Sequence, residues 1–218
     1  MGMPCVNIGD FLKKDVPLVF RNSIVLTAVW LLLIPAIRGI SNLNEIQSAQ
    51  CLSQSISLTG IILIVPLVRP EMEAGVKEVI YTKPWPYLKS VLIRIVCGLV
   101  FSTLFILTSA WVMRLQNCSF PFWTFSGVTI LYAAFMGLAG LALSQIGKNV
   151  IAGYLAAAGY WSLKQLEIIP EGTMLDLFPV IDGRIQIEKL LILLTVDGLL
   201  LLWFLLAVRR SSGGYSDA

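Results

Sequence analysis

The chain has 218 residues, of which 57% are hydrophobic and 13% are charged, and its mean hydropathy is +0.82. Charged residues make up about a quarter of an ordinary soluble domain, so this composition excludes a soluble globular protein and indicates an integral membrane protein. The net charge of +3 gives no case for nucleic-acid binding, because the basic residues are spread along the chain rather than gathered in one patch.

The N-terminal segment lacks the apolar core and small-residue cleavage site of a secretory signal. Residues Ile8 to Phe20 mix apolar and charged side chains in a pattern that predicts an interfacial helix on the inner leaflet, broken or restarted near Pro17. A positively charged lead-in to the first span is the alternative.

Six apolar runs follow. A spanning helix needs about 20 mostly apolar residues, because the hydrocarbon core is about 30 Å thick and each residue rises about 1.5 Å. Lipid offers backbone amides no partners, and the apolar residues do not alternate as in a barrel wall, so helices are predicted. We expect one transmembrane domain over residues 1–218, an all-α bundle of six transmembrane helices. The predicted spans cover residues 24–40, 52–68, 88–113, 122–146, 150–168 and 190–208.

The distribution of lysine and arginine predicts the orientation. With the N-terminus inside, only five of the 16 basic residues fall outside, and the other 11 are cytoplasmic. We therefore expect a multi-pass protein of the cytoplasmic (inner or plasma) membrane, in a bacterium, with both termini in the cytoplasm. The five external residues are Arg38, Arg114, Lys164, Arg184 and Lys189.

The second span is unusually polar in its outer half. Ser53, Ser57 and Gly60 fall on one helical face, which either lines a passage between two membrane subunits or packs against another helix. The two interpretations remain equally open on the sequence.

The loop from about residue 69 to residue 90 concentrates charges and turn residues between two apolar runs. Its acidic and basic residues recur at helical spacing, which predicts a short amphipathic helix with one polar face. Gly75 would let a partner approach closely, and Pro84 with Pro86 would end the helix before the third span. A solvated charged loop is the alternative.

The fourth and fifth spans carry small residues at helical spacing. Ala133, Gly137, Gly140 and Ser144 form a stripe on the fourth span, and the fifth offers Gly153 and Ala157 as a complementary surface. Small side chains let two helices approach closely in a membrane, so we predict packing between these spans.

The external connection, residues 169–188, is punctuated by proline and glycine. Its apolar residues suggest a short helix that dips back toward the membrane, and a solvated loop is the alternative; these residues are Met174, Leu175, Leu177 and Phe178. Cys51 and Cys118 both fall near the external surface, where they either pair or remain two unpaired small residues; the sequence favours the unpaired state.

Asp197 is the one acid deep inside an apolar run, and burying it ionised without a partner costs about 3 kcal/mol on insertion scales. In one interpretation Asp197 belongs to the translocation path, where it contacts a polar substrate or couples motions. In the other it forms a structural hydrogen bond between helices.

Several enzyme classes are excluded. The chain has no histidine, which excludes histidine-containing zinc sites, histidine-ligated haem and Ser-His dyads. It has no G-x-x-x-x-G-K-[ST] phosphate loop, so any nucleotide that drives it binds another chain. We expect no catalytic residue, metal or cofactor on this chain.

The loop after the second span also carries a specific pattern. Glu73, Gly75 and Glu78 form E-x-G-x-x-E, followed by Pro84 six residues on and by Arg94 ten residues after that. This pattern resembles the permease subunit of the type-2 ATP-binding-cassette exporter family, the six-span class that includes ABCG-like transporters.

The resemblance implies a role and a set of partners. The loop 69–90 would hold the coupling helix that rests on an ATPase subunit, with the contacting residues Glu71, Glu73, Gly75, Lys77, Glu78 and Tyr81. Two ATP-binding subunits, carrying ATP and Mg²⁺, and a second permease chain, identical or different, would complete an exporter of peptides, peptide antibiotics, lipids or drugs in membrane lipid. A non-transporting assembly or immunity factor that binds a peptide at the external face is the alternative function.

Overall fold

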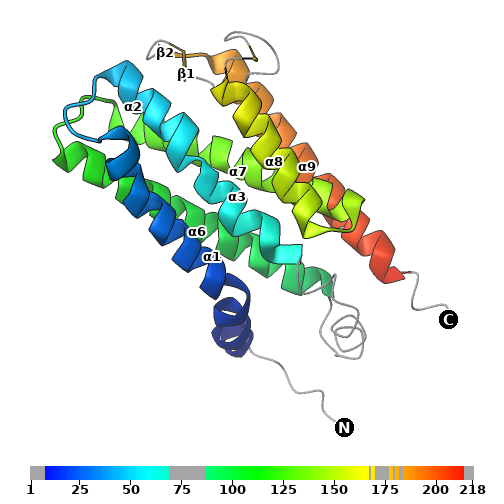
Figure 1. The fold of residues 1–218 in the computed structure, drawn as a ribbon. Helices are drawn as coiled ribbons and strands as arrows, with labels where there is room; N and C mark the ends of the chain where they lie inside the picture. Colours follow the sequence, from blue (N-terminus) through cyan, green and yellow to red (C-terminus); the bar gives the residue numbers. More distant parts are fainter. Residues whose placement is uncertain are drawn as a thin grey trace.

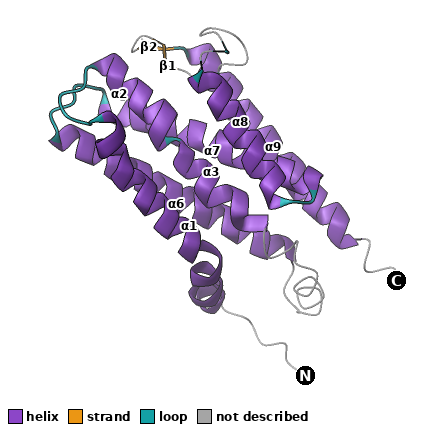
Figure 2. Cartoon of the chain, in the orientation of Figure 1, coloured by secondary structure: helices purple, strands orange, loops and turns teal. Residues whose placement is uncertain are grey.

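The computed structural model describes residues 8–68, 87–166, 168–169, 177–178, 180–181 and 184–213, and these residues are almost entirely helical (Figures 1 and 2). The first and last long helices are α1 (Ile8–Arg38) and α9 (Ile187–Gly213). Between them lie α2 (Glu45–Cys51), a π-helical segment (Leu52–Ile56), α3 (Leu58–Ile64), a 3₁₀ turn (Val65–Val68), α6 (Tyr87–Leu115), α7 (Phe122–Gly147) and α8 (Val150–Gln165).

Five helices in the described ranges are long and apolar enough to cross a membrane, which makes the chain a multi-pass helical membrane protein. The second of them runs unbroken from α2 through the π-helical segment to the 3₁₀ turn. These five spans are Asp15–Arg38, Glu45–Val68, Leu88–Leu115, Phe122–Gly147 and Ile187–Arg210.

The helix α8 differs from the fifth span that the sequence predicts over residues 150–168. It has 16 residues and ends at Gln165, so at about 1.5 Å per residue it extends only about 24 Å. It runs antiparallel to α7, since Gly153 faces Ser144 and Tyr160 contacts Phe135. It thus leads the chain back from the end of α7 toward the start of α9, but it is shorter than a full span.

The N-terminal prediction also needs correction. Rather than a separate interfacial helix broken near Pro17, the chain forms one helix from Ile8 to Arg38 with Pro17 inside it. Figure 1 shows this helix bending near its start, as expected where a proline removes a backbone donor and crowds the preceding turn. The location of this first part on the membrane surface stays a prediction.

The bundle has two distinct ends (Figure 1). The described chain begins and finishes at one of them, which we call the terminal end; the 3₁₀ turn that follows α3 and the start of α6 also lie there. At the opposite, distal end, two loops are hydrogen-bonded to each other, from Asn42 N to Gln116 O at 2.9 Å and from Ser119 N to Leu43 O at 3.2 Å. Both described ends of the chain are therefore on one side of the bundle.

A short antiparallel ladder also lies at the distal end. The strands β1 (Val180–Ile181) and β2 (Arg184–Ile185) pair Val180 with Ile185 and Ile181 with Arg184. They precede α9 directly and so fix the point at which the last helix begins.

The helix α7 is the centre of the bundle and contacts α3, α6, α8 and α9. Large apolar side chains on the outer helices are exposed, including Leu18 of α1 and Leu155 of α8, which are 81% and 69% exposed. Outward apolar residues around a tightly packed centre are the arrangement that lipid requires, because lipid solvates them as well as the protein interior does.

The small-residue stripe does pack as predicted. A Cβ added to Gly137 would lie 2.6 Å from Ile64 Cδ1 and 2.7 Å from Gly60 O, and one added to Gly140 would lie 3.2 Å from Ala157 Cβ. The stripe serves two partners, since its first half receives α3 and its second half receives α8. Close backbone approach at these glycines sets the spacing of three helices.

We expect Gly137→Leu to unfold or strongly destabilise the protein in detergent, because the new side chain would meet Ile64 and the backbone of Gly60. The matched control is Gly127→Leu on the same helix, since nothing lies within 4 Å of a Cβ added there. Thermal unfolding followed by light scattering or size-exclusion recovery checks the difference. Equal loss of folded protein in both variants would contradict this account of the stripe.

Candidate functional site

The most irregular part of the membrane domain is the π-helical segment Leu52–Ile56 in the second span. Ser57 N donates to Leu52 O at 3.0 Å, five residues earlier rather than four. Serine and glutamine are abundant here, and serine side chains compete with the helical backbone for hydrogen bonds. Single π turns inside α-helices occur frequently at functional sites, which directs attention to this segment.

Two tryptophans from different helices bind consecutive carbonyl groups of this segment. Trp30 Nε1 of α1 donates to Ser55 O at 2.8 Å, and Trp161 Nε1 of α8 donates to Gln54 O at 2.5 Å. We call these two hydrogen bonds the indole clasp. An indole N–H is a donor only, and a backbone carbonyl group has two lone pairs that can accept a hydrogen bond. The clasp joins α1, the second span and α8 at a single turn.

A side-chain contact strengthens the clasp on the α8 side. Gln165 Nε2 donates to Gln54 Oε1 at 3.4 Å, one helical turn beyond Trp161. The side-chain amide oxygen of Gln165, Oε1, is buried and has no hydrogen-bond partner among the described residues. The end of α8 thus holds polar groups against the second span, inside an otherwise apolar layer.

The residues predicted to line a passage are buried within the single chain. Ser57 is fully buried and its hydroxyl donates to Ser53 O, while the Ser53 hydroxyl donates to Gln50 O at 3.2 Å. Gly60 lies against the backbone of Ala133 in α7. In the chain by itself this face therefore packs and bonds locally, and a passage between two subunits stays a prediction.

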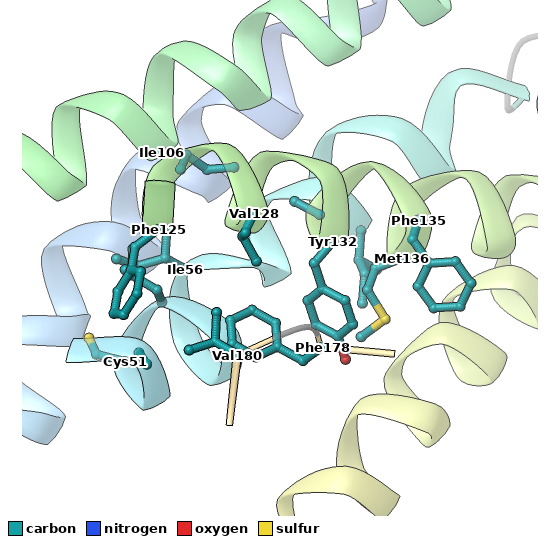
Figure 3. Packing of buried hydrophobic residues seen from close by; sticks show 14 of the residues in the cluster. Cys51, Ile56, Ile106, Phe125, Val128, Tyr132, Phe135, Met136, Phe178 and Val180 are labelled. Atoms are coloured by element: carbon teal, nitrogen blue, oxygen red, sulfur yellow. The ribbon is translucent and has the colours of Figure 1, made fainter. Parts of the chain in front are cut away.

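The external connection does turn back into the bundle at Phe178. This residue is 4% exposed, and its ring lies edge-on to Tyr132 with the centroids 5.2 Å apart (Figure 3). Tyr132 is ten residues into α7, which corresponds to about 15 Å along the helix. The dip therefore exists, but Leu177 and Phe178 are not helical as the sequence suggested, and Met174 and Leu175 lie outside the described residues.

Aromatic rings and one cation complete this region. Phe135 contacts Tyr132 and Tyr160 at centroid distances of 6.1 and 5.8 Å, and Lys164 Nζ lies 5.6 Å from the Phe178 ring centroid. A cation over an aromatic face contributes about 0.5–2 kcal/mol, depending on its exposure to water. The segment before α9 is thus attached to both α7 and α8.

At the terminal end, an ion pair joins α1 to α6. Arg94 Nε lies 2.7 Å from Asp15 Oδ2, and its Nη2 lies 2.7 Å from Oδ1. The side chains of Arg94 and Asp15 are 11% and 18% exposed, so water screens the pair only weakly. Arg94, the last position of the sequence pattern, therefore forms a paired, bidentate contact seven residues after the start of α6.

The predicted ATPase-contacting residues, from Glu71 to Tyr81, lie outside the described residues. Their attachment points are described: the second span ends at Val68 and α6 begins at Tyr87. Val68, Val91 of α6 and Phe20 of α1 belong to one buried cluster, so the helices on both sides of the loop are packed together.

The remaining predicted site residue, Asp197, is 9% exposed on α9. Within the described structure its two carboxylate oxygens are buried without a hydrogen-bond partner. Among the described residues no hydrogen bond joins its carboxylate to Ser53, Ser57 or Gly60, so the four predicted path residues do not form one hydrogen-bonded cluster.

Cysteines and metal ligands add no site to the described part of the chain. Cys51, Cys97 and Cys118 are free, which agrees with the unpaired state that the sequence favours, and Cys118 Sγ donates to Ile40 O at 3.1 Å. No three His, Cys, Asp or Glu side chains among the described residues gather as a metal site would require.

Sequence reasoning missed Trp30, Trp161 and Asp15. Tryptophan is common at membrane interfaces, so its presence gives no hint of a bond to another helix. Asp15 looked like one of several surface charges in a lead-in segment. Only the fold shows that each of these residues has a partner far away in the chain.

Comparisons of the chain with protein-family models, with curated proteins and with solved structures give no match.

We expect Trp30→Phe and Trp161→Phe each to destabilise the second span by about 1–3 kcal/mol, because a buried carbonyl loses its donor while most of the ring remains. Hydrogen–deuterium exchange of peptides covering residues 50–60, in nanodiscs, measures the effect. The control is Trp203→Phe, since Trp203 is 41% exposed on α9. No faster exchange in either clasp variant than in this control would contradict a stabilising role.

For the ion pair, Asp15→Asn and Arg94→Gln should each lower stability, and the double variant should lose less than the sum, with a coupling of about 1–3 kcal/mol. A double-mutant cycle in detergent measures this. Arg21→Gln, at an exposed position of α1, is the control and should change little. Additive losses would show that the pair contributes nothing of its own.

Proposed function

We propose that the chain is the membrane-spanning subunit of an ATP-driven exporter, in which separate ATPase subunits act on the loop between the second span and α6. The observation that carries this proposal is the pattern of Glu73, Gly75 and Glu78 with Pro84 and Arg94. Its location supports the proposal, because the loop joins two long apolar helices at the end of the bundle where the described chain begins and finishes.

The packing beside the loop supports a lever mechanism. The helices α3 and α6 contact each other directly, so a force applied to the loop acts on both. The Asp15–Arg94 pair extends the same body to α1. Closure of two ATPase subunits around ATP and Mg²⁺ would thus displace three helices together at the terminal end, which the proposal places in the cytoplasm.

In this proposal the second span is the helix that moves. It is joined to the loop at the terminal end. In its outer half the indole clasp bonds it to α1 and α8, and the π turn lies at the clasp. Single π turns inside α-helices are frequent at functional sites, and this one interrupts the regular hydrogen-bond ladder of the second span. Movement of this span relative to a second copy, or to a sister chain, would open a route for an amphipathic or hydrophobic cargo.

The crossing between α7 and α9 and the class of cargo belong to the same proposal. The helix α8 and the segment that ends at Phe178 together lead from the end of α7 to the start of α9, and we assign this unit as the return crossing of a six-span permease. Cargo of the peptide, lipid or drug class agrees with a path bordered by apolar residues and a few hydroxyl groups.

Co-purification with ATPases encoded beside this chain tests the proposal. Glu78→Arg and Gly75→Trp should each abolish association and cargo-stimulated ATP hydrolysis, because reversing or crowding a contact in an interface costs about 2–5 kcal/mol. Glu45→Arg, exposed at the distal end, is the matched charge-reversal control and should leave both unchanged. Unchanged association and hydrolysis in both loop variants would refute the coupling role.

Topology supplies a separate check. In a background without native cysteines, Glu73→Cys should react with an impermeant maleimide only in inverted vesicles, and Glu45→Cys only in intact cells. The reverse pattern would place the loop outside the cell and overturn the proposal, whatever the ATPase result.

A further inference from the structure

The carboxyl group of Asp197 is in an unusual position for an acid. It lies on the buried side of α9 with Leu193 and Phe204, which are 0% and 1% exposed and follow the helical spacing of a single face. Ten residues separate it from the start of α9 and twelve from Arg209, which places it about 15 and 18 Å along the axis from those two points. Asp197 is therefore near the middle of a membrane span.

The side chain has no counter-ion within the described structure. Both of its carboxylate oxygens are buried without a hydrogen-bond partner there. Lys189, the nearest basic residue on its own helix, is eight residues away, or about 12 Å along the axis. That separation exceeds the reach of the two side chains toward each other.

The described residues of the helices packed against α9 supply no hydrogen-bond partner to the Asp197 carboxylate either. Among the described elements these are chiefly α7 and α6. Throughout α7 the one titratable side chain is the neutral Tyr132. On α6, Arg94 is engaged by Asp15. The titratable groups of α6 are Tyr87, Lys89, Arg94, Cys97 and Arg114, and the others on α9 are Glu188, Lys189, Arg209 and Arg210.

We propose that Asp197 is a proton-binding site within the membrane, in which the carboxyl group is held as the neutral acid at neutral pH. An ionised carboxylate without partners in an apolar interior carries a large desolvation cost, whereas the neutral acid avoids most of it. The proposal rests on the burial and isolation of the side chain, and it does not depend on the transport role.

The buried carboxyl group lies beside a flank of α9 that faces lipid, so local motion of the helix would let a reagent that dissolves in lipid reach it. Gly198, the next residue, is exposed, and nothing lies within 4 Å of a Cβ added to it. A hydrophobic carbodiimide reacts with a neutral carboxylic acid by addition: the acid proton moves to one nitrogen and the carboxyl oxygen bonds the central carbon. Migration of the acyl group to the other nitrogen then gives a stable N-acylurea, and no atom leaves. The adduct adds the full mass of the reagent.

Infrared spectroscopy of the full chain in nanodiscs at pH 7 is the primary test. The wild type should show the carbonyl band of a neutral carboxylic acid, and Asp197→Asn should lose it. Asparagine preserves the shape of the acid without the titrating proton, so this variant should still fold, and its thermal unfolding at pH 7 should match the wild type. Absence of the band from folded wild-type protein would overturn the proposal.

Mass spectrometry after treatment with dicyclohexylcarbodiimide gives a second readout that needs no variant. The adduct should appear on the peptide containing Asp197, and Glu45 and Glu188 are internal controls because both are exposed at the distal end. An adduct on Asp197 would support a neutral acid at this position, and the infrared band decides the case in which the reagent does not reach the buried carboxyl group. Neither experiment involves an ATPase, so its outcome is separate from the fate of the proposed exporter function.

Discussion

Backbone carbonyl groups in a membrane must find their hydrogen-bond donors within the protein, because hydrocarbon supplies none. In the distal half of this structure, the constraint acts most clearly at the π turn of the second span, where other helices provide donors. Trp30 and Trp161 provide donors to two consecutive carbonyl groups, and they come from helices on two sides of the span. The irregular turn therefore determines where α1 and the end of α8 must lie.

The same requirement explains the polar residues of the second span. Their hydroxyl groups donate mainly to carbonyl groups one turn earlier, as Ser57 does to Ser53 and Thr59 Oγ1 does to Ile56 O at 2.9 Å. Such bonds let serine and threonine be buried at little cost, and they leave glycine to make the close contact with α7. A polar helix in lipid is thus compatible with a tightly packed centre, and packing and function need not exclude each other on this face.

The sequence predicted those features that follow from local pattern. Five of the spans follow from apolar runs of sufficient length, and the contact of α7 with α8 follows from small residues such as Gly140 and Gly153 at helical spacing. Features that depend on distant residues were beyond it. The continuation of α1 through Pro17, the shortness of α8 and the Asp15–Arg94 pair each depend on what another segment of the chain provides. The loop residues that suggest a motor partner lie outside the described structure, so their role still rests on the sequence pattern.

The shortness of α8 has a consequence for the surrounding lipid. A helix of 16 residues extends about 24 Å, so if it begins at the terminal side of the bundle it ends about 6 Å short of the far surface of a hydrocarbon core that is about 30 Å thick. The acyl chains next to it must shorten, or headgroups and water must descend toward the Lys164 ammonium and the Gln165 amide. Among the described helices, α8 therefore imposes hydrophobic mismatch on its own flank, and membranes rich in short or unsaturated acyl chains would solvate that flank at the lowest elastic cost.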